Sequence, residues 1–427
     1  MSKVQKKMLF LVLLLANCVA LVAFYFSSQS IELYFILFSS TSFVYLMMCF
    51  LIPYIKIGNR ELLLIAFLSL VIKLLFVSTN PVGSDDYYRY LWDGKVQTNG
   101  TNPFQFAPND SELTHLSSDI LPAKVSYPNI KTIYFPVAQT VFSLSYWLSE
   151  ESVVGLKIYL MAADLLILIC LFFLFKQFKI DNKFALIYLT LPLIYFQFYI
   201  DAHIDLFGAA LMLASLTLYF YNKKLLSYII LGLSISVKPT GLILIPFYFQ
   251  NEVMLKKKLF AGAVPLIVFT ITFLPYVFTA TPLDTLILYS SKWTFNGMIY
   301  NAVNLFFDGT TSIRIACGIL FLLAIFVIYI LKIRLEAKIY LALFLLLIFS
   351  PIVHPWYLIW FAVLLPISRR VSGIYFVAAA SLTFATVAQF QQTGIWNENP
   401  IVLIIEYLPL TAIFVYELWK NKFELQL

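Results

Sequence analysis

Two adjacent carboxylates, Asp85 and Asp86, follow an apolar run in the segment GSDDYYRYLWDGKVQTNG. If a helix begins at Asp86, the side chains of Asp86, Tyr90 and Asp93 recur at i, i+4 and i+7 and share one face. A carboxylate that is partly withdrawn from water beside a second carboxylate becomes more basic, which suits a general base. The structural alternative is that Ser84 or Asp85 caps the free amides at the start of this helix.

A second polar cluster, Asp201, His203 and Asp205, lies in YIDAHIDLFGAALMLAS between two apolar runs. A helix points residues i and i+2 in different directions, so these side chains could converge on a metal ion only from an extended or turning backbone. Polar contacts to a sugar or an acceptor are therefore favoured over a metal site. A solvated turn with capping side chains is the structural alternative.

Lys238 interrupts an apolar hairpin in SVKPTGLILIP. The two arms, at about 12 residues each, are short for full membrane crossings, and the Pro-Thr-Gly break leaves backbone groups that need partners. A lysine at such a break is a candidate functional residue, and its ammonium group suits a phosphate at the depth of the lipid headgroups. The alternative is that Lys238 only extends its amine to the membrane surface.

His354 precedes a proline in SPIVHPWYLIW, at the end of another apolar run. Proline restricts the preceding residue, which fixes His354 near the membrane interface, while Trp356, Tyr357 and Trp360 fit an interfacial aromatic belt. The companion loop YSSKWTFNGMIYNAVN offers a cation, a ring and amides that could hold a sugar phosphate or a pyranose, and it could equally be a surface turn. Its candidate residues are Lys292, Trp293, Asn296 and Asn301.

The composition places these groups in a membrane protein. Hydrophobic residues make up 61% of the 427 residues and charged residues only 12%. Apolar runs of about 20 residues recur along the chain, long enough to cross a hydrocarbon layer of about 30 Å as helices. We therefore predict an all-α, polytopic transmembrane bundle of about 11–14 membrane segments, forming a single domain over residues 1–427. The four cysteines lie inside apolar runs and indicate neither a disulfide framework nor a metal site.

The basic residues predict the orientation of the bundle. They cluster in short loops between apolar runs, so the formal charge of +7 is explained by the positive-inside rule rather than by nucleic-acid binding. Both termini are then cytoplasmic, and the long loops 80–152 and 280–312 face the extracytoplasmic side. This orientation requires that residues 134–147 form an interfacial helix and do not cross the membrane. Their length, their aromatic ends and Pro136 favour the interfacial helix.

Other charged and polar residues have structural interpretations. Lys157 and Asp164 stand seven residues apart on one helix face and are predicted to join helices through polar contacts. Lys73 lies near the end of its apolar run and is predicted to extend its amine to the membrane surface. His115, in a polar stretch of the first long loop, is predicted to be exposed.

Taken together, the motifs resemble the GT-C superfamily of integral-membrane glycosyltransferases, and within it the bacterial mannosyltransferases that depend on polyprenyl-phosphate mannose. The resemblance rests on SDDYYRYLWDG, NGTNPFQFAP, IYFPVAQTVF, AHIDLFGAALMLAS, VKPTGLILIPF and HPWYLIW, in that order, over residues 84–360. It implies that the first long outer loop carries juxtamembrane helices and the catalytic acid, which maps onto Asp86 with Asp85 in reserve. The family's His-Asn-Asp element is His203-Ile204-Asp205 here, so this chain lacks the middle amide.

The resemblance implies an enzyme of the bacterial cytoplasmic membrane that moves a hexose, with mannose expected, from a polyprenyl-phosphate donor to an extracytoplasmic hydroxyl with inversion. Asp86 would be the general base, and Lys238, His354 and Lys292 would bind the donor phosphate, with no metal or other cofactor. The acceptor would be a glycan, a glycolipid or a protein. The residues expected to contact sugar or acceptor are Tyr88, Arg89, Tyr90, Asp93, His203, Asp205, Trp293, Asn296 and Trp356.

A lipid-linked sugar flippase or transporter is the alternative function. Broken helices and intramembrane charges also occur in transporters. Transporters bind near the middle of the bilayer, however, whereas the polar clusters of this chain are predicted to gather on one outer face. The enzyme is therefore the favoured interpretation.

Overall fold

The computed structural model describes residues 1–307 and 309–420, and these residues form helices and loops without a β-strand, which confirms the predicted all-α fold. The helices of the first half are α1 (Lys3–Tyr25), α2 (Ile31–Leu51), η1 (Ile52–Tyr54), α3 (Asn59–Leu75), α4 (Asp86–Thr98), η2 (Ser111–Leu116), α5 (Pro136–Ser149), α6 (Val154–Phe178), η3 (Asn182–Ala185), α7 (Leu186–Leu189), α8 (Pro192–Ile194), η4 (Tyr195–Ile200) and α9 (Asp205–Phe220). The helices of the second half are α10 (Lys224–Ile235), η5 (Pro239–Ile243), α11 (Leu244–Asn251), α12 (Leu255–Phe273), α13 (Asp284–Lys292), α14 (Met298–Asn304), α15 (Thr310–Ile330), α16 (Leu335–Phe349), η6 (Pro355–Leu358), α17 (Ile359–Ala362), α18 (Leu365–Ser368), α19 (Val371–Ala379), η7 (Ala380–Thr383), α20 (Phe384–Thr393) and α21 (Pro400–Trp419).

Within the described residues, six helical segments are long and apolar enough to cross a membrane. They are α1, Ile31–Tyr54, α6, α15, Val371–Thr393 and α21. The pair Asn182–Leu189 and Pro192–Ile200, bent by 49°, makes a seventh if it is one broken span. The protein is therefore a multi-pass membrane protein.

The number of long helices is below the roughly 11–14 segments predicted from apolar length. Two predicted segments are the short apolar helices α9 and α10. Others are interrupted by prolines that begin a new short helix, as Pro192, Pro239 and Pro355 do. Proline has no amide hydrogen to donate and its ring clashes with the preceding turn, so a continuous apolar run becomes several short helices.

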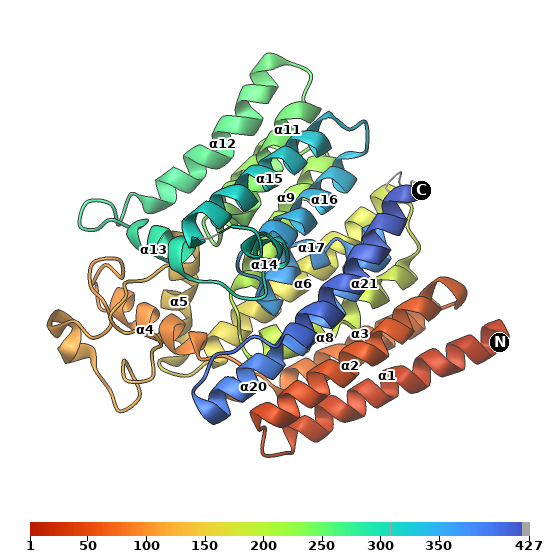
Figure 1. Ribbon diagram of the computed structural model, residues 1–427, viewed down its shortest axis with the longest axis horizontal. Coiled ribbons are helices and arrows are strands. Elements are labelled where there is room, and N and C mark those ends of the chain that lie inside the picture. The colour runs from red at the N-terminus through yellow and green to blue at the C-terminus, as the bar shows by residue number, and fades with distance from the viewer. Residues whose placement is uncertain (308, 421–427) are drawn as a thin grey trace.

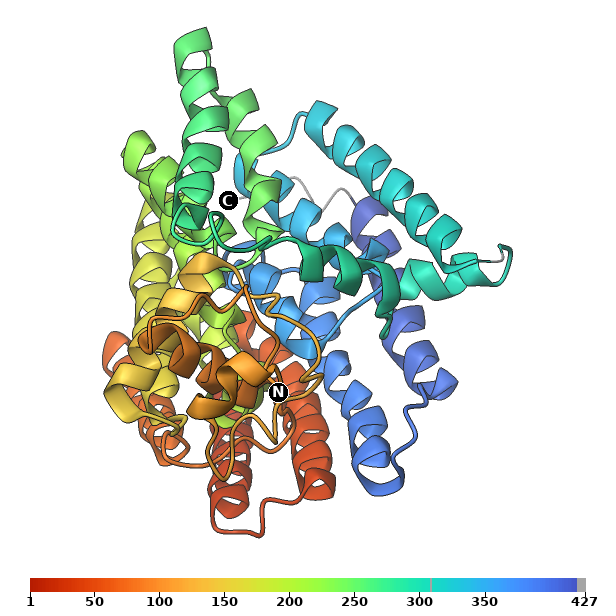
Figure 2. The ribbon, with the colours of Figure 1, turned by 90° about the vertical axis from the view of Figure 1, so that its left-hand side faces the viewer.

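The long helices run side by side, with α1, α2 and α3 at one flank and α11, α12 and α15 at the other (Figure 1). The start of α1 and the end of α21 lie at one end of this bundle, whereas α4, α5 and their connecting loop lie at the other end (Figures 1 and 2). The second long loop reaches the same end, where the Trp293 ring packs edge-on against Tyr127 with 5.3 Å between centroids. Two loops that are far apart in the sequence thus meet at the end of the bundle opposite the start of α1 and the end of α21.

α5 covers most of the segment predicted to be an interfacial helix. Its 14 residues extend about 21 Å, which is too short to cross a membrane. α5 packs along α4, and Gly94 allows this close approach, because a Cβ atom there would lie 2.3 Å from the Phe142 carbonyl oxygen. Its place at a membrane surface stays a prediction. One apolar core cluster contains residues from α1 through α21, while the single-domain assignment also stays a prediction.

The buried charges join helices. Lys73 is 2% exposed and its Nζ lies 2.6 Å from Asp164, so the prediction that Lys73 extends to the membrane surface is wrong. Asp164 also accepts hydrogen bonds from two tyrosine hydroxyls, and Lys157 donates to two backbone carbonyls at the end of α3. The predicted helix-joining roles of Lys157 and Asp164 are confirmed, and His115 is exposed as predicted.

Candidate active site

Asp86 lies at the first position of α4, and its carboxylate makes no hydrogen bond to the described part of the chain. Its backbone amide is bonded to Ser84 Oγ at 3.2 Å, so the serine, one of the two predicted caps, satisfies the start of the helix. Asp85 occupies the N-cap position but its side chain makes no capping hydrogen bond, and it accepts one from the Ser126 hydroxyl. The Asp86 side chain remains 34% exposed. The two carboxylates therefore have different surroundings. Asp85 is bonded to Ser126 in the first long loop, whereas Asp86 faces His203.

Asp201, His203 and Asp205 lie in a buried turn. Their exposed fractions are 0%, 0% and 3%, so the alternative of a solvated turn is wrong. The π-helix η4 ends at Ile200, and Ala202 follows with a positive φ of 62°, which turns the chain before α9 begins at Asp205. Among the described residues no group of three His, Cys, Asp or Glu side chains could hold a metal ion. The three side chains do not converge on one point: Asp201 bonds to backbone amides, His203 stacks on Trp356, and Asp205 pairs with Lys238.

Lys238 is held by groups of the protein. It lies in extended backbone (φ −156°) before Pro239, as residues that precede proline prefer. Its Nζ is 2.6 Å from Asp205 Oδ1 and 3.3 Å from the centroid of the Tyr357 ring, and its side chain is 27% exposed. Asp205 Oδ1 also accepts a 3.0 Å hydrogen bond from the Trp360 indole. The amine is thus fixed in the site rather than extended to the surface.

His203 is a fully buried imidazole without a hydrogen-bond partner. Neither of its ring nitrogens is hydrogen-bonded within the part of the chain that the structure describes. Its Nδ1 lies 3.6 Å from Asp86 Oδ2, slightly beyond hydrogen-bond distance. A buried polar atom without a partner costs about 1–3 kcal/mol. The His203 ring therefore presents Nδ1 toward Asp86 with no other hydrogen-bond partner among the described residues.

Trp356 lies between two imidazoles. The centroid of its ring is 3.7 Å from that of His203 and 4.3 Å from that of His354, and both pairs of planes are within 12° of parallel. Two imidazoles this close to one indole must cover opposite faces, since on one face they would overlap. The predicted contact of Trp356 with a sugar cannot therefore be a stacking contact. His354 itself stacks on Phe295 at 4.8 Å.

The electrostatic environment makes Asp86 basic. Burial and the neighbouring negative charges of Asp85 and Asp205 raise the pKa of the Asp86 carboxyl to about 7. A general base is most effective when its pKa lies near the working pH, because it is then ionised and still a good proton acceptor.

Arg89 and Asp93 lie away from this cluster. Arg89 Nε is 2.9 Å from Asp93 Oδ1, and Arg89 also donates to the Ile130 carbonyl. Asp93 Oδ2 accepts hydrogen bonds from Thr132 at 2.5 Å and from Gln139 at 2.9 Å. Because both side chains are buried and their polar atoms are largely used in joining α4 to the loop and α5, the structure favours a structural role over the predicted sugar contacts.

Tyr88 and Tyr90 behave differently from each other. Tyr90 is 2% exposed, stacks on Phe142 at 4.6 Å and has its hydroxyl 3.5 Å from that of Tyr134. Tyr88 is partly exposed, packs on Tyr87 at 4.0 Å, and carries Lys124 above its ring. Of the two, Tyr88 retains surface that a substrate could contact.

The second long loop contributes rings more than polar groups. Trp293 stacks on Tyr289 with 5.4 Å between centroids, and the Tyr289 hydroxyl is 3.0 Å from that of Tyr357. The Tyr357 ring in turn contacts the Lys238 amine, so these rings connect the loop to Lys238. Lys292 is exposed and Asn301 lies in α14.

Asn296, in the same loop, faces the C-terminal part of the chain. It is 2% exposed, its amide donates to Glu398 and its side chain donates to Glu406 at 3.0 Å. Its predicted contact with a sugar is therefore replaced by contacts within the protein.

Two residues of this region were not assigned site roles from the sequence. Trp360 was assigned to an aromatic belt, but it is 2% exposed and donates to Asp205. Asp201 was assigned no role beyond its cluster, yet it binds the backbone that leads into α4. For Trp360 and Asp201 the sequence shows only an indole or a carboxylate inside an apolar run. This pattern does not reveal which residue the group bonds to.

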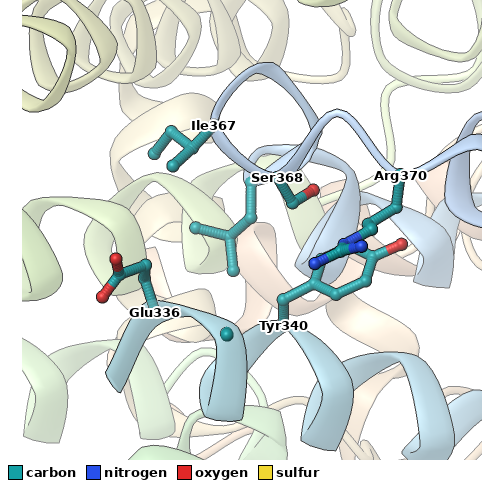
Figure 3. Close-up of a pocket in the computed structure, with 7 residues that line it drawn as sticks. Glu336, Tyr340, Ile367, Ser368 and Arg370 are labelled. Carbon is teal, nitrogen blue, oxygen red and sulfur yellow. The ribbon is translucent and has the colours of Figure 1, made fainter. Parts of the chain in front are cut away.

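A small cavity lies elsewhere, between α16, α18 and the start of α19 (Figure 3). Its lining includes Glu336, Tyr340, Ser368 and Arg370. Its volume of about 10 Å³ is roughly that of one water molecule. A sugar cannot enter it, so this cavity is not a candidate substrate site.

Together the fold and the site define a class of protein. A multi-pass helical bundle that gathers a basic carboxylate, a lysine and two imidazoles at one end has the groups that a membrane glycosyltransferase needs. Residues 16–252 match the family model described as alpha-(1→6)-mannopyranosyltransferase, N-terminal domain, and residues 294–418 match the MptB C-terminal domain. The first match covers more than half of the chain, so the protein belongs to this mannopyranosyltransferase family.

The family assignment confirms the resemblance to membrane mannosyltransferases and the prediction of an enzyme. The protein is a glycosyltransferase with mannosyltransferase activity. A search of curated proteins finds no match to the chain.

Proposed function

We propose that the protein transfers mannose from a polyprenyl-phosphate mannose donor to an acceptor hydroxyl at the extracytoplasmic face of the bacterial cytoplasmic membrane. The observation that carries the proposal is the juxtaposition of three groups: the partly exposed Asp86 carboxylate, the His203 ring, whose nitrogens have no hydrogen-bond partner in the described residues, and the Lys238 amine, whose charge acts on Asp86. A base with a cation close enough to act on it electrostatically supplies the two groups that displacement of a lipid phosphate requires.

In the proposed reaction Asp86 takes the proton of the acceptor hydroxyl, whose oxygen attacks the anomeric carbon. The bond between that carbon and the phosphate oxygen breaks, and the lipid phosphate leaves with the bonding electrons. Lys238 has three N–H donors, of which Asp205 uses one. The others would stabilise the departing phosphate, with the His354 ring nearby. The roles of Lys292, Trp293 and Tyr88 in binding donor or acceptor remain part of the proposal.

The chemistry of the linkage follows from the family description. An alpha-(1→6) linkage requires the primary hydroxyl at C6 of the acceptor sugar as the nucleophile. A single displacement inverts the anomeric carbon, so an α product requires a β-linked donor. We therefore propose a mannose-terminated glycan or glycolipid as the acceptor.

The orientation in the membrane is proposed from the charges and the fold. The start of α1 and the end of α21 lie at the end of the bundle opposite α4 and α5 (Figure 1), and the N-terminal segment MSKVQKK is basic. The positive-inside rule favours a cytoplasmic location for such a segment. The Asp86 site would then open to the extracytoplasmic side, where a lipid-linked sugar is accessible from the bilayer.

The test is direct transfer of sugar by the purified protein in detergent. Radiolabelled polyprenyl-phosphate mannose is offered with an α-mannoside acceptor, and the product is analysed for its linkage. We expect label in a product that an α-(1→6)-specific mannosidase releases. Transfer from a nucleotide-linked mannose, with none from the lipid-linked donor, would contradict the proposal.

A pH profile tests the proposed base separately. Because the pKa of Asp86 is raised to about 7, the ionised, active form is lost as the pH falls below that value. We expect kcat/KM to fall about tenfold per pH unit below 7 and to level off above it. In Asp85→Asn the midpoint moves to lower pH, since a neighbouring negative charge has been removed. A flat profile between about pH 5 and 8 would contradict the assignment.

A further inference from the structure

The segment that leads into α4, residues 76–83, is bound by two buried charged residues. On one side Lys157 of α6 donates from Nζ to the carbonyl oxygens of Phe76 at 2.8 Å and Thr79 at 2.7 Å. On the other side Asp201 Oδ1 accepts hydrogen bonds from the amides of Val82 at 3.1 Å and Gly83 at 2.8 Å. A cation therefore holds the carbonyls and an anion holds the amides of the same short segment.

Both charged side chains are fixed in place. Lys157 and Asp201 are each 0% exposed. Asp201 Oδ2 accepts a 2.5 Å hydrogen bond from the Tyr34 hydroxyl, which in turn accepts one of 2.7 Å from Gln197. Hydrogen bonds to charged groups are stronger than neutral ones, and in a buried environment they hold their geometry tightly. The two groups can thus define where the segment lies.

Gly83 shows how closely the segment is held. A Cβ atom at this position would lie 2.5 Å from a ring carbon of Phe384 and 2.6 Å from Asp201 Oδ2. No larger residue fits while the amide of residue 83 remains bonded to Asp201. Asp86 follows only three residues later, at the first position of α4.

We propose that Lys157 and Asp201 are positioning residues that clamp residues 76–83 and thereby set the place of Asp86 in the site. The inference rests on the proposed role of Asp86 as the base. A base must be held within a few tenths of an ångström of the proton it accepts, and a displacement of about 1 Å can cost about 100-fold in rate. Lys157 and Asp201 bond to the backbone of this segment rather than to Asp86 itself, so their effect on Asp86 is through geometry and charge.

The experiment uses the full-length protein in detergent and two measurements on Asp201→Ala. The first is hydrogen exchange at the amides of Val82 and Gly83, and the second is kcat and KM for transfer. We expect both amides to lose protection, kcat to fall about 100-fold, and KM to stay within about threefold. Glu417→Ala is the matched control, because Glu417 accepts an amide and a hydroxyl in the same way, from Val371 at 2.8 Å and Ser372 at 2.5 Å, at the other end of the bundle.

The conservative variant Asp201→Asn covers the case in which Asp201→Ala does not fold. Asparagine keeps a carbonyl oxygen for the two amides but removes the charge, so kcat is expected within about tenfold of wild type. The pH profile is expected to move to lower pH, because one negative charge near Asp86 is gone.

Three results would overturn the clamp: unchanged protection in Asp201→Ala, a normal kcat despite lost protection, or the same fall in kcat in Glu417→Ala. Failure of the proposed function is distinguishable, since Asp86→Asn would then retain activity while hydrogen exchange still reports on the clamp.

Discussion

Asp86→Asn is expected to lower the rate of mannose transfer at least about 1,000-fold while leaving the fold intact. Proton transfer to a positioned base contributes about 10²–10⁴-fold to catalysis, and an amide cannot accept the proton. Asparagine has nearly the size of aspartate, and the Asp86 side chain is 34% exposed, so no buried charge or cavity is created. The measurement is kcat for transfer from polyprenyl-phosphate mannose, with thermal unfolding of the same preparations as the check on folding.

Asp85→Asn is the matched control for this prediction. Asp85 is the adjacent carboxylate, is exposed, and is bonded to Ser126 rather than directed at His203. We expect Asp85→Asn to retain activity within about tenfold of wild type at its optimum pH, since it changes only the charge near the base. If Asp85→Asn were inactive and Asp86→Asn active, the base would be Asp85 and the present geometry would not be that of the reacting enzyme.

The sequence was sufficient for the fold class and for several of the residues that meet in the site. Apolar runs of about 20 residues have few solutions in a membrane other than helices, and this made the all-α fold predictable. Asp86, His203, Lys238 and His354 stood out because each is a charged or titratable residue beside or within an apolar run. A polar group in such a run is costly, so it is usually functional or paired.

The partners of these residues could not be predicted. Asp93 was placed with Asp86 because i and i+7 share a helix face, but its carboxylate is bonded to Thr132 and Gln139, 39 and 46 residues away. Local periodicity says which face of a helix a residue occupies and nothing of the distant loop that covers it. The same limit applies to Trp360, whose indole meets Asp205 across 155 residues.

The buried turn at 201–205 shows a different limit. The spacing of two residues between Asp201, His203 and Asp205 excludes a regular helix as a way to bring their side chains together. It did not reveal that a π-helix and a positive φ at Ala202 would turn the chain. Nor did it show that the turn is fully buried, because burial there depends on rings from the C-terminal half of the chain, such as Trp356.

Lys238→Met is expected to reduce both folding and transfer, and a second substitution should separate the two effects. Among the described residues, removing the amine leaves the buried Asp205 carboxylate with the Trp360 indole as its remaining side-chain partner, which is expected to cost about 3–5 kcal/mol of stability. In Lys238→Met/Asp205→Asn no uncompensated charge remains, so much of this stability should return. Transfer should not return, because the group that stabilises the leaving phosphate is still missing, at a cost of about 10²–10³-fold.

The pair formed by Lys73 and Asp164 provides the control for the Lys238 variants. The N–O distance is 2.6 Å in both pairs, but the Lys73 side chain is 3% exposed where that of Lys238 is 27% exposed, and the Lys73–Asp164 pair lies among the helices rather than in the site. Lys73→Met should therefore lose a comparable amount of stability while each folded molecule keeps its rate of transfer. Folded fractions are measured by thermal unfolding, and rates are expressed per folded molecule. If the double variant at Lys238 and Asp205 transferred mannose at the wild-type rate, Lys238 would be only the counter-ion of Asp205, and stabilisation of the leaving phosphate would have to come from His354 or from the bound lipid itself.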